Sequence, residues 1–189
     1  LGGGGLGGSG IAGRIVKTFF QNRADLPVEV VSDYKLPNYV NENTLVILSS
    51  YSGNTEETLS MYIDAMERNA RIMVITTGGL LGELAEETNV LTYYAETGYQ
   101  PRMALGYSLT YLVLIFSELF EQNALNNLKS TLRRLKDSSS FIARANKGFE
   151  DINKEVDNKF IIICDPDTHP IGVRLAQQLQ ENAKMEAFV

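Results

Sequence analysis

The sequence predicts an α/β fold in which a doubly wound parallel sheet is flanked by helices. Short apolar runs alternate with longer amphipathic stretches, which is the pattern of repeated βαβ units. The runs are rich in Val, Ile and Leu, as expected of parallel strands that are covered on both faces. Glycine and hydroxyl residues follow several of these runs, at the positions where ligand-binding loops lie in open α/β sheets.

The first part of the chain accounts for this sheet. It begins Leu1-Gly2-Gly3-Gly4, so the first strand is expected to be missing or shortened, unless these glycines form a flexible tail. In chain order, the expected elements are a helix over Ile11–Asn22, strands over Val28–Val31 and Leu45–Ser49, a helix over Thr55–Asn69, a strand over Arg71–Thr76, a helix over Leu80–Glu87, a strand over Val90–Tyr93 and a helix over Met103–Gln122. The last helix is apolar over much of its surface, which predicts either a core helix or a partner interface.

The second part of the chain is expected to be helical before a new strand begins. Its expected elements are helices over Leu125–Asp137 and Ser138–Val156, a strand over Phe160–Cys164 and a helix over Pro170–Asn182. The polar run Ser138-Ser139-Ser140 marks a helix break, and Cys164 is expected to be a small core residue. We therefore expect a first domain over residues 1–122, a helical connection over 123–156, and the start of a second α/β unit over 157–189 that is cut short.

The composition is that of an ordinary globular protein. Of the 189 residues, 44% are hydrophobic and 21% are charged, and the net charge is −6 with a pI near 4.9. An acidic chain without a basic stripe argues against nucleic-acid binding. The longest apolar stretch, Leu109–Phe116, is too short to cross a bilayer, and no signal peptide opens the chain, so we expect a cytoplasmic protein.

The loop Ser50–Thr55 is the strongest functional signal in the chain. Ser50, Ser52 and Thr55 supply three hydroxyl groups, and a glycine between them lets the backbone approach a ligand closely. The helix that follows adds N–H groups without intrahelical partners, so the loop predicts an anion site. It has no lysine and no Gly-Lys-Ser/Thr ending, which favours a monophosphate ester over a nucleoside triphosphate. The alternative is an ordinary helix cap at Asn54 or Thr55.

The glycine-rich start allows two further interpretations. Gly5-Leu6-Gly7-Gly8-Ser9-Gly10 satisfies the pattern G-x-G-x-x-G, and Glu29 or Asp33 lies near the distance at which a dinucleotide fold keeps its ribose-binding acid. Alternatively, Gly8-Ser9-Gly10 lines a sugar-phosphate pocket at the start of the following helix. A third loop, Thr76-Thr77-Gly78-Gly79, belongs to the same sheet edge and could supply backbone donors.

Five motifs, in this order and spacing, resemble those of the sugar isomerase (SIS) superfamily, and within it the bifunctional phosphoglucose/phosphomannose isomerase family. The motifs are Gly5–Gly10, Ser50–Thr58, Thr76–Gly79, Gln100–Gly106 and Glu181–Lys184. The resemblance implies a flavodoxin-like SIS fold and a dimeric enzyme without metal or cofactor. Such an enzyme interconverts fructose 6-phosphate with glucose 6-phosphate and mannose 6-phosphate. The chain is expected to be a fragment, because a family histidine and threonine would lie beyond Val189.

The resemblance also implies roles for individual residues. The substrate-binding residues would be Gly7, Gly8, Ser9, Ser50, Ser52 and Thr55, with the hydroxyl loop on the phosphate and the glycine loop on the sugar. Glu181 would be the catalytic base and Arg102 the active-site arginine. Both suit isomerisation, which needs a base to carry a proton between C1 and C2 and a positive group to stabilise the enediolate. The expected partners are a hexose 6-phosphate and a second copy of the chain, with no nucleic acid and no membrane.

Two other classes of function stay open. A non-catalytic phosphosugar sensor would keep the phosphate loop, and Glu181 and Arg102 would then be surface or ion-pairing residues. A dinucleotide-binding oxidoreductase would use the glycine pattern instead. The single histidine, His169, matches no catalytic position of the family and is predicted to start a helix. With Asp165 and Asp167 it makes too poor a ligand set to predict a metal site.

Overall fold

The structure is a computed structural model that describes all residues except 1, 5–7, 122–123, 137–138 and 154–158. The chain divides into two compact units, Leu1–Phe120 and Glu121–Val189, and each is described by itself. In the part of the chain that the structure describes, no helix is both long and apolar enough to cross a membrane.

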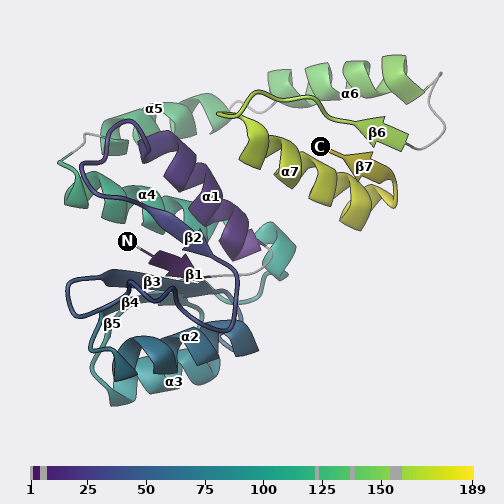
Figure 1. Ribbon diagram of the computed structural model, residues 1–189. Coiled ribbons are helices and arrows are strands. Elements are labelled where there is room, and N and C mark those ends of the chain that lie inside the picture. Colours follow the sequence, from purple (N-terminus) through teal and green to yellow (C-terminus); the bar gives the residue numbers. More distant parts are fainter. Residues whose placement is uncertain (1, 5–7, 122–123, 137–138, 154–158) are drawn as a thin grey trace. The chain divides into compact units, whose positions relative to one another are not determined.

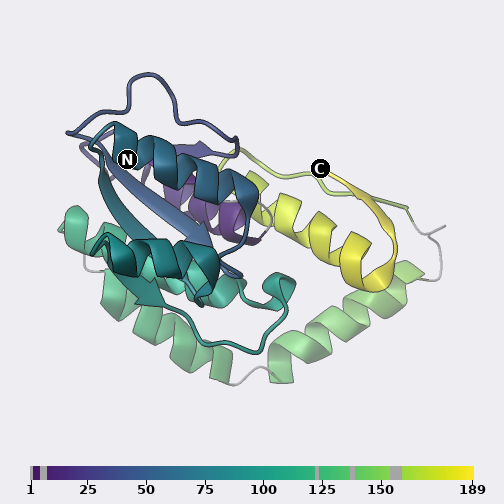
Figure 2. The ribbon, with the colours of Figure 1, turned by 90° about the horizontal axis from the view of Figure 1, so that it is seen from below.

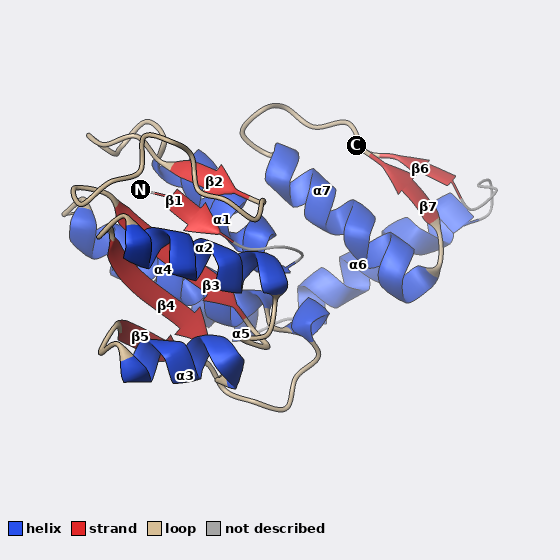
Figure 3. Ribbon diagram, turned by 60° about the horizontal axis from the view of Figure 1, so that its bottom comes forward, coloured by secondary structure: helices blue, strands red, loops and turns tan. Residues whose placement is uncertain are grey.

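Five parallel strands form the sheet of the first unit (Figure 3). The strands are β1 (Gly2–Gly4), β2 (Glu29–Val31), β3 (Leu45–Ser50), β4 (Arg71–Thr76) and β5 (Leu91–Tyr94). Their order is β2-β1-β3-β4-β5, which is the order of flavodoxin-like folds. The predicted doubly wound parallel sheet is therefore confirmed.

Helices cover both faces of this sheet (Figure 1). They are α1 (Gly8–Phe20), α2 (Glu56–Glu67), α3 (Gly79–Glu87) and α4 (Leu105–Leu119), and a short 3-10 helix η1 (Pro101–Met103) precedes α4. Helices α1 and α4 pack against each other on one face, and α2 and α3 lie on the other. Figure 2 views the first unit from the second of these faces and shows α2 and α3 side by side across the strands.

Strand β3 shows how the side chains divide between the two faces. Successive residues of a strand point to opposite sides. Val46 and Leu48 belong to the buried cluster under α2 and α3, whereas the hydroxyl of Ser49 reaches Ser108 of α4 at 3.3 Å. From Val46 to Ser49 no β3 residue is more than 5% exposed. A central strand that is covered on both faces therefore explains the apolar run of the sequence.

The first strand is present but short. Gly2–Gly4 pair in parallel with β2 and β3, with Gly3 opposite Val30 and Ile47. A flexible glycine tail is therefore the wrong interpretation of these residues, and a shortened strand is the right one. The sheet ladder is made by backbone N–H and C=O groups, so a strand can form without apolar side chains.

The apolar helix predicted over Met103–Gln122 is a core helix. Leu112, Ile115 and Phe116 of α4 are only 5–6% exposed. The Phe116 ring packs on Phe20 of α1, with ring centroids 5.5 Å apart. These contacts favour the core interpretation over a partner interface. The other predicted elements of the first unit begin and end within three residues of their observed bounds.

The second unit contains two helices followed by a βαβ unit. Its elements are α5 (Ala124–Lys136), α6 (Ser139–Asn153), β6 (Lys159–Ile161), α7 (His169–Gln178), the π-helix η2 (Leu179–Ala183) and β7 (Glu186–Phe188). Strands β6 and β7 pair in parallel, with α7 and η2 between them in the chain.

The run Phe160–Cys164 is less buried than predicted. Strand β6 ends at Ile161, Ile163 is 94% exposed, and Cys164 is half-buried rather than a core residue. The sulfur of Cys164 packs on Gly172 of α7, where an added Cβ would lie 2.3 Å from it. Gly172 lies against Ile162 as well as Cys164, and the residues that alternate with them along the run stay exposed.

An ion pair at the end of α2 fixes the loop between β2 and β3. Arg68 donates to Asp64 at 2.6 Å and to the carbonyl oxygens of Leu36 and Pro37 at 3.3 and 2.7 Å. The second carboxylate oxygen of Asp64 accepts from the Leu36 N–H at 2.9 Å. Desolvation opposes the charge of Asp64, but the hydrogen bonds from Leu36 and Arg68 outweigh it and hold the pKa of this carboxyl below its usual value.

The substitution Asp64→Ala is expected to lower the free energy of unfolding at pH 7 by about 1–3 kcal/mol, because Leu36 and Arg68 lose their acceptor. The folded-state pKa of Asp64 is depressed, so its contribution is present above the unfolded-state pKa of about 3.9 and is lost as the pH falls through the folded-state value. The difference from wild type in urea unfolding should therefore narrow towards about pH 3. The exposed Glu67→Ala on the same helix is the control. An equal loss of unfolding free energy in both variants would show that the Asp64–Arg68 ion pair does not stabilise the loop between β2 and β3.

Candidate functional site

The carboxyl edge of the sheet contains the point at which the strand order reverses. Strand β1 lies between β2 and β3, so the chain crosses to opposite sides of β1 in successive βαβ units. In open α/β sheets, ligands bind outside the carboxyl ends of the strands at such a point. The candidate loop, residues 50–55, begins there with the last residue of β3. Gly8 and Ser9 form the first turn of α1 after β1, and Gly7 lies outside the described residues.

The three hydroxyl groups of the candidate loop lie in different environments. Ser50 is 3% exposed, and its Oγ accepts from the Gly53 N–H at 3.2 Å and pairs with Thr55 Oγ1 at 2.8 Å. Ser52 is exposed, and its Oγ accepts from the Asn54 N–H at 3.3 Å. Thr55 is half-buried. The structure therefore brings Ser50 and Thr55 into contact and leaves Ser52 on the outside of the loop.

Thr55 is the N-cap residue of α2, but its side chain does not cap the helix. Its backbone is extended, with φ −76° and ψ 117°, and its hydroxyl pairs with Ser50 instead of a first-turn N–H group. The Asn54 side chain is also used elsewhere, because its Oδ1 accepts from the Leu80 N–H in α3 at 3.0 Å. Thr55 therefore holds the N-cap position that the cap interpretation allowed, but neither its side chain nor that of Asn54 caps the helix. The start of α2 keeps its N–H donors without a cap side chain.

The candidate loop packs against the loop after β4, backbone to backbone. Gly53 has φ +70°, and a Cβ there would lie 1.8 Å from the carbonyl oxygen of Gly78. Gly79 has φ +65°, and a Cβ there would lie 2.4 Å from the carbonyl oxygen of Ser52. Only glycine permits both this backbone conformation and this approach without strain.

Hydrogen bonds join the same two loops. Thr77 donates its N–H at 3.1 Å and its hydroxyl at 2.6 Å to the carbonyl oxygen of Tyr51. The Leu81 N–H donates to the carbonyl oxygen of Gly53 at 2.9 Å. The loop after β4 thus supports the candidate loop and fixes its path.

The strand order argues against a dinucleotide fold. Such a fold has the order 3-2-1-4-5-6, in which β1 lies next to the fourth strand, whereas here it lies next to β3. Glu29 is the first residue of β2, at the opposite edge of the sheet from the glycine-rich turn, and it pairs with Lys17 at 3.4 Å. Asp33 follows β2 and accepts from the Tyr34 N–H at 2.6 Å. Glu29 therefore lies at the wrong end of its strand to bind a ribose.

Arg102 lies in η1, beyond β5, and its residue is exposed. The segment between β5 and η1 is attached to the candidate loop through Tyr51. The Tyr51 hydroxyl donates to the carbonyl oxygen of Glu96 at 2.9 Å and accepts from the Tyr99 N–H at 3.1 Å. Sequence reasoning missed Tyr51, although a single aromatic residue among small loop residues was a usable signal.

The remaining predicted site residues lie in the second unit. Glu181 is exposed on η2, and such single-turn π-helices are frequent at functional sites. His169 is the first residue of α7, so its predicted place at a helix start is confirmed. The Asp165 carboxylate accepts the N–H and the hydroxyl of Thr168, both at 2.8 Å, and these bonds lower the pKa of Asp165. Asp165 therefore closes the turn before α7.

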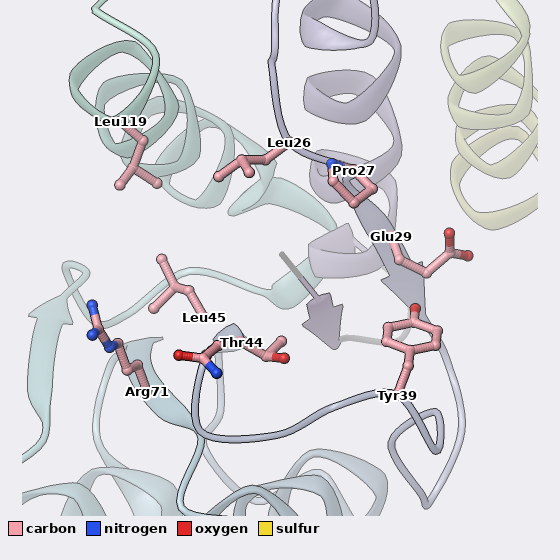
Figure 4. Close-up of a pocket in the computed structure, with 9 residues that line it drawn as sticks. Leu26, Pro27, Glu29, Tyr39, Thr44, Leu45, Arg71 and Leu119 are labelled. Atoms are coloured by element: carbon pink, nitrogen blue, oxygen red, sulfur yellow. The ribbon is translucent and has the colours of Figure 1, made fainter.

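A cavity of about 770 Å³ lies at the opposite, amino edge of the first sheet (Figure 4). Its lining includes Leu26, Leu45 and Leu119, with Glu29 and Arg71 at the first residues of β2 and β4. None of the residues predicted to bind or convert a sugar phosphate lines this cavity. It is therefore separate from the candidate site.

Several known proteins that are similar to this chain are named as enzymes that act on sugar phosphates. The SIS domain model matches residues 4–117. A bifunctional phosphoglucose/phosphomannose isomerase of Caldicellulosiruptor bescii is 51% identical over 115 residues, covering 61% of this chain and 34% of the relative. The Aquifex aeolicus protein of the same name is 35% identical over 97% of this chain and 56% of its own length. A D-glucosamine-6-phosphate 4-epimerase of Sulfolobus acidocaldarius is 35% identical over 97% of this chain and 57% of its own length.

The chain thus spans about half the length of the curated relatives that match nearly all of it. Among solved structures, the tagatose-6-phosphate ketose/aldose isomerase of Escherichia coli superposes with a TM-score of 0.71 at 19% identity, covering 99% of this chain and 55% of that one. At this identity the likeness concerns the fold, which agrees with the predicted SIS architecture. The resemblance carried by the five sequence motifs is confirmed, and the chain belongs to the SIS domain family.

Proposed function

We propose that the intact protein is a phosphosugar isomerase that interconverts fructose 6-phosphate with glucose 6-phosphate and mannose 6-phosphate. The observation that carries the proposal is the candidate loop, which places three hydroxyl groups and a helix start without a cap side chain at the reversal point of the sheet. The relatives named as phosphoglucose/phosphomannose isomerases support the same substrate class.

The phosphate would bind to Ser52, Thr55 and the first N–H groups of α2. Ser50 would orient Thr55, because its buried hydroxyl already pairs with it at 2.8 Å. The candidate loop contains no basic residue, so the helix dipole and the oriented donors would provide the attraction for the anion. The sugar would contact the glycine-rich turn, through Gly7, Gly8 and Ser9.

Glu181 and Arg102 would carry the chemistry. The Glu181 carboxylate would take the proton from C2 of the open-chain aldose and deliver it to C1, so that a C2–H bond breaks and a C1–H bond forms. The hydroxyl proton moves from O2 to O1 in the same conversion, so the C1 carbonyl becomes a hydroxyl and the C2 hydroxyl becomes a carbonyl. The Arg102 guanidinium would stabilise the negative charge of the enediolate between these steps. An aldose and its ketose have the same oxidation state overall, so the proposed reaction needs no redox cofactor.

The organisation of the whole protein is part of the same proposal. We place the first SIS subdomain at residues 1–122, a helical connection at 123–156 and the start of a second SIS-like subdomain at 157–189. The parallel pairing of β6 and β7 around α7 supports a second α/β unit. A cytoplasmic homodimer without a nucleic-acid or membrane partner fits the family resemblance and the net charge of −6.

A related function is the second candidate. The relative named as a glucosamine-6-phosphate 4-epimerase is as similar to this chain as the Aquifex aeolicus isomerase, at 35% identity. The two activities change different carbons of the sugar, C1 and C2 in the isomerase and C4 in the epimerase. NMR analysis of the products formed from fructose 6-phosphate and from glucosamine 6-phosphate therefore separates them.

The substitution Glu181→Gln is expected to lower kcat of the intact enzyme by about 10²- to 10⁴-fold, because the amide keeps the shape of the side chain but cannot accept the proton. The affinity for fructose 6-phosphate should change little. The exposed Glu150→Gln in the same unit is the control. Wild-type turnover in the Glu181 variant would exclude it as the base, and a wild-type protein that binds phosphosugars without turnover would favour the sensor alternative.

The substitution Ser52→Ala is expected to weaken the affinity for fructose 6-phosphate about tenfold, because one hydrogen bond to a charged group is lost. Stability should not fall, since Ser52 is exposed. Calorimetric titration measures the affinity, with the exposed Ser140→Ala as the matched control. If both variants bind like wild type, Ser52 does not contact the phosphate.

The affinity for fructose 6-phosphate is expected to decrease from pH 7.5 to pH 5.5, because the phosphate has a second pKa near 6 and the proposed donors favour the dianion. Titrations at both pH values, with fructose, inorganic phosphate and NAD as parallel ligands, check this. An affinity that is independent of pH would count against phosphate recognition. Binding of NAD without binding of the phosphosugar would support the dinucleotide alternative.

A further inference from the structure

We propose that Tyr51 is a positioning residue that couples the candidate loop to the segment carrying Arg102. The proposal rests on the proposed function, because it concerns how the phosphate-binding groups and the arginine of that reaction are held relative to each other. Tyr51 stands between Ser50 and Ser52 in the chain, and its side chain reaches the segment after β5. Since β4 lies between β3 and β5, the side chain bridges loops of strands that are not neighbours.

The Tyr51 hydroxyl occupies the inside of a bend. Glu96 and Tyr99 are the first and fourth residues of this bend, and Gly98 between them has φ +99°. In an ordinary β-turn the first carbonyl accepts from the fourth N–H group. Here the hydroxyl is inserted between them, donating to the Glu96 carbonyl at 2.9 Å and accepting from the Tyr99 N–H at 3.1 Å. The shape of the bend therefore depends on a side chain from another loop.

Both ends of the Tyr51 residue are held. Its carbonyl oxygen accepts two hydrogen bonds from Thr77, at 3.1 and 2.6 Å, so its backbone cannot shift without breaking the contact between the loops after β3 and β4. The residue as a whole is half-buried. The backbone of Tyr51 is fixed and its hydroxyl makes two hydrogen bonds. The side chain therefore acts as a strut that sets the distance between the candidate loop and the bend.

The other side of the bend is attached to α4. The Tyr107 hydroxyl donates to the Glu96 carboxylate at 2.6 Å, and the rings of Tyr99 and Tyr107 pack with centroids 5.8 Å apart. The hydrogen bond to Glu96 raises the pKa of Tyr107, together with desolvation and the neighbouring Tyr99. The bend is thus held between the candidate loop and the helix that follows Arg102.

The contacts of Tyr51 affect the position of Arg102 rather than the affinity of the candidate loop for phosphate. Arg102 follows the bend by three residues, so the position of η1 depends on the bend. A reacting group that is displaced by about 1 Å can cost on the order of 10²-fold in rate. Loss of the strut should therefore lower turnover more than the affinity for phosphate, which Ser52, Thr55 and α2 would still provide.

The test is Tyr51→Phe in the intact enzyme, which keeps the ring and removes both hydrogen bonds. We expect kcat to fall about tenfold, with a change of less than about threefold in the affinity for inorganic phosphate. Amide hydrogen exchange at Tyr99 should become about tenfold faster, because its acceptor is lost. The exposed Tyr39→Phe, at the amino edge of the sheet, removes the same hydroxyl far from the bend and should match wild type.

Each other outcome would contradict a part of the proposed role of Tyr51. Unchanged exchange at Tyr99 would show that the hydroxyl does not hold the bend. Faster exchange with wild-type kcat would show that the bend does not position the arginine, and an equal loss of phosphate affinity and kcat would make Tyr51 a part of the binding site. A wild-type protein without any activity on sugar phosphates would remove the proposed function itself, while the exchange rates would still report on the strut.

Discussion

The candidate site depends on the close approach of two loop backbones, after β3 and after β4. Gly53 and Gly79 both have positive φ, and a Cβ on either would collide with a carbonyl oxygen of the other loop. Without these β-carbons the two backbones come close enough for direct hydrogen bonds, such as the one from the Thr77 N–H to the Tyr51 carbonyl at 3.1 Å. The positions of the loop hydroxyls follow from this contact, because a wider separation would break the bonds that fix their backbone.

This contact also decides which polar groups of the loop can meet a ligand. Ser50 and Asn54 are used inside the fold, the first to hold Thr55 and the second to bond the start of α3. Ser52 remains exposed. The division makes physical sense, since a loop whose own groups satisfy one another is already ordered before binding and loses less conformational freedom when a ligand arrives.

Much of the fold could be predicted from the sequence, because buried parallel strands leave apolar runs and hydroxyl loops at their ends. The first strand could not be predicted in full, since Gly2–Gly4 pair through the backbone alone. The burial of Cys164 was overestimated because the run around it is covered on one face in this structure. The candidate loop was visible in the sequence, but the partners of Asn54 and Tyr51 lie in distant segments, so no local pattern could assign them.

The charge of the candidate loop explains why these supporting contacts matter for function. The loop has no cation, and Glu56 and Glu57 add negative charge to the first turn of α2. A dianion placed there would be held by short-range hydrogen bonds and the helix dipole, which fall off steeply when the geometry changes. In the proposed reaction the positive charge belongs to Arg102, which lies on a separate segment. Its attraction would therefore stabilise the enediolate of the transition state rather than the phosphate group of the bound substrate. In that reaction, the uncharged candidate loop and Arg102 would have to be held at a fixed distance from each other. Tyr51 is a side chain that bridges the two segments on which they lie.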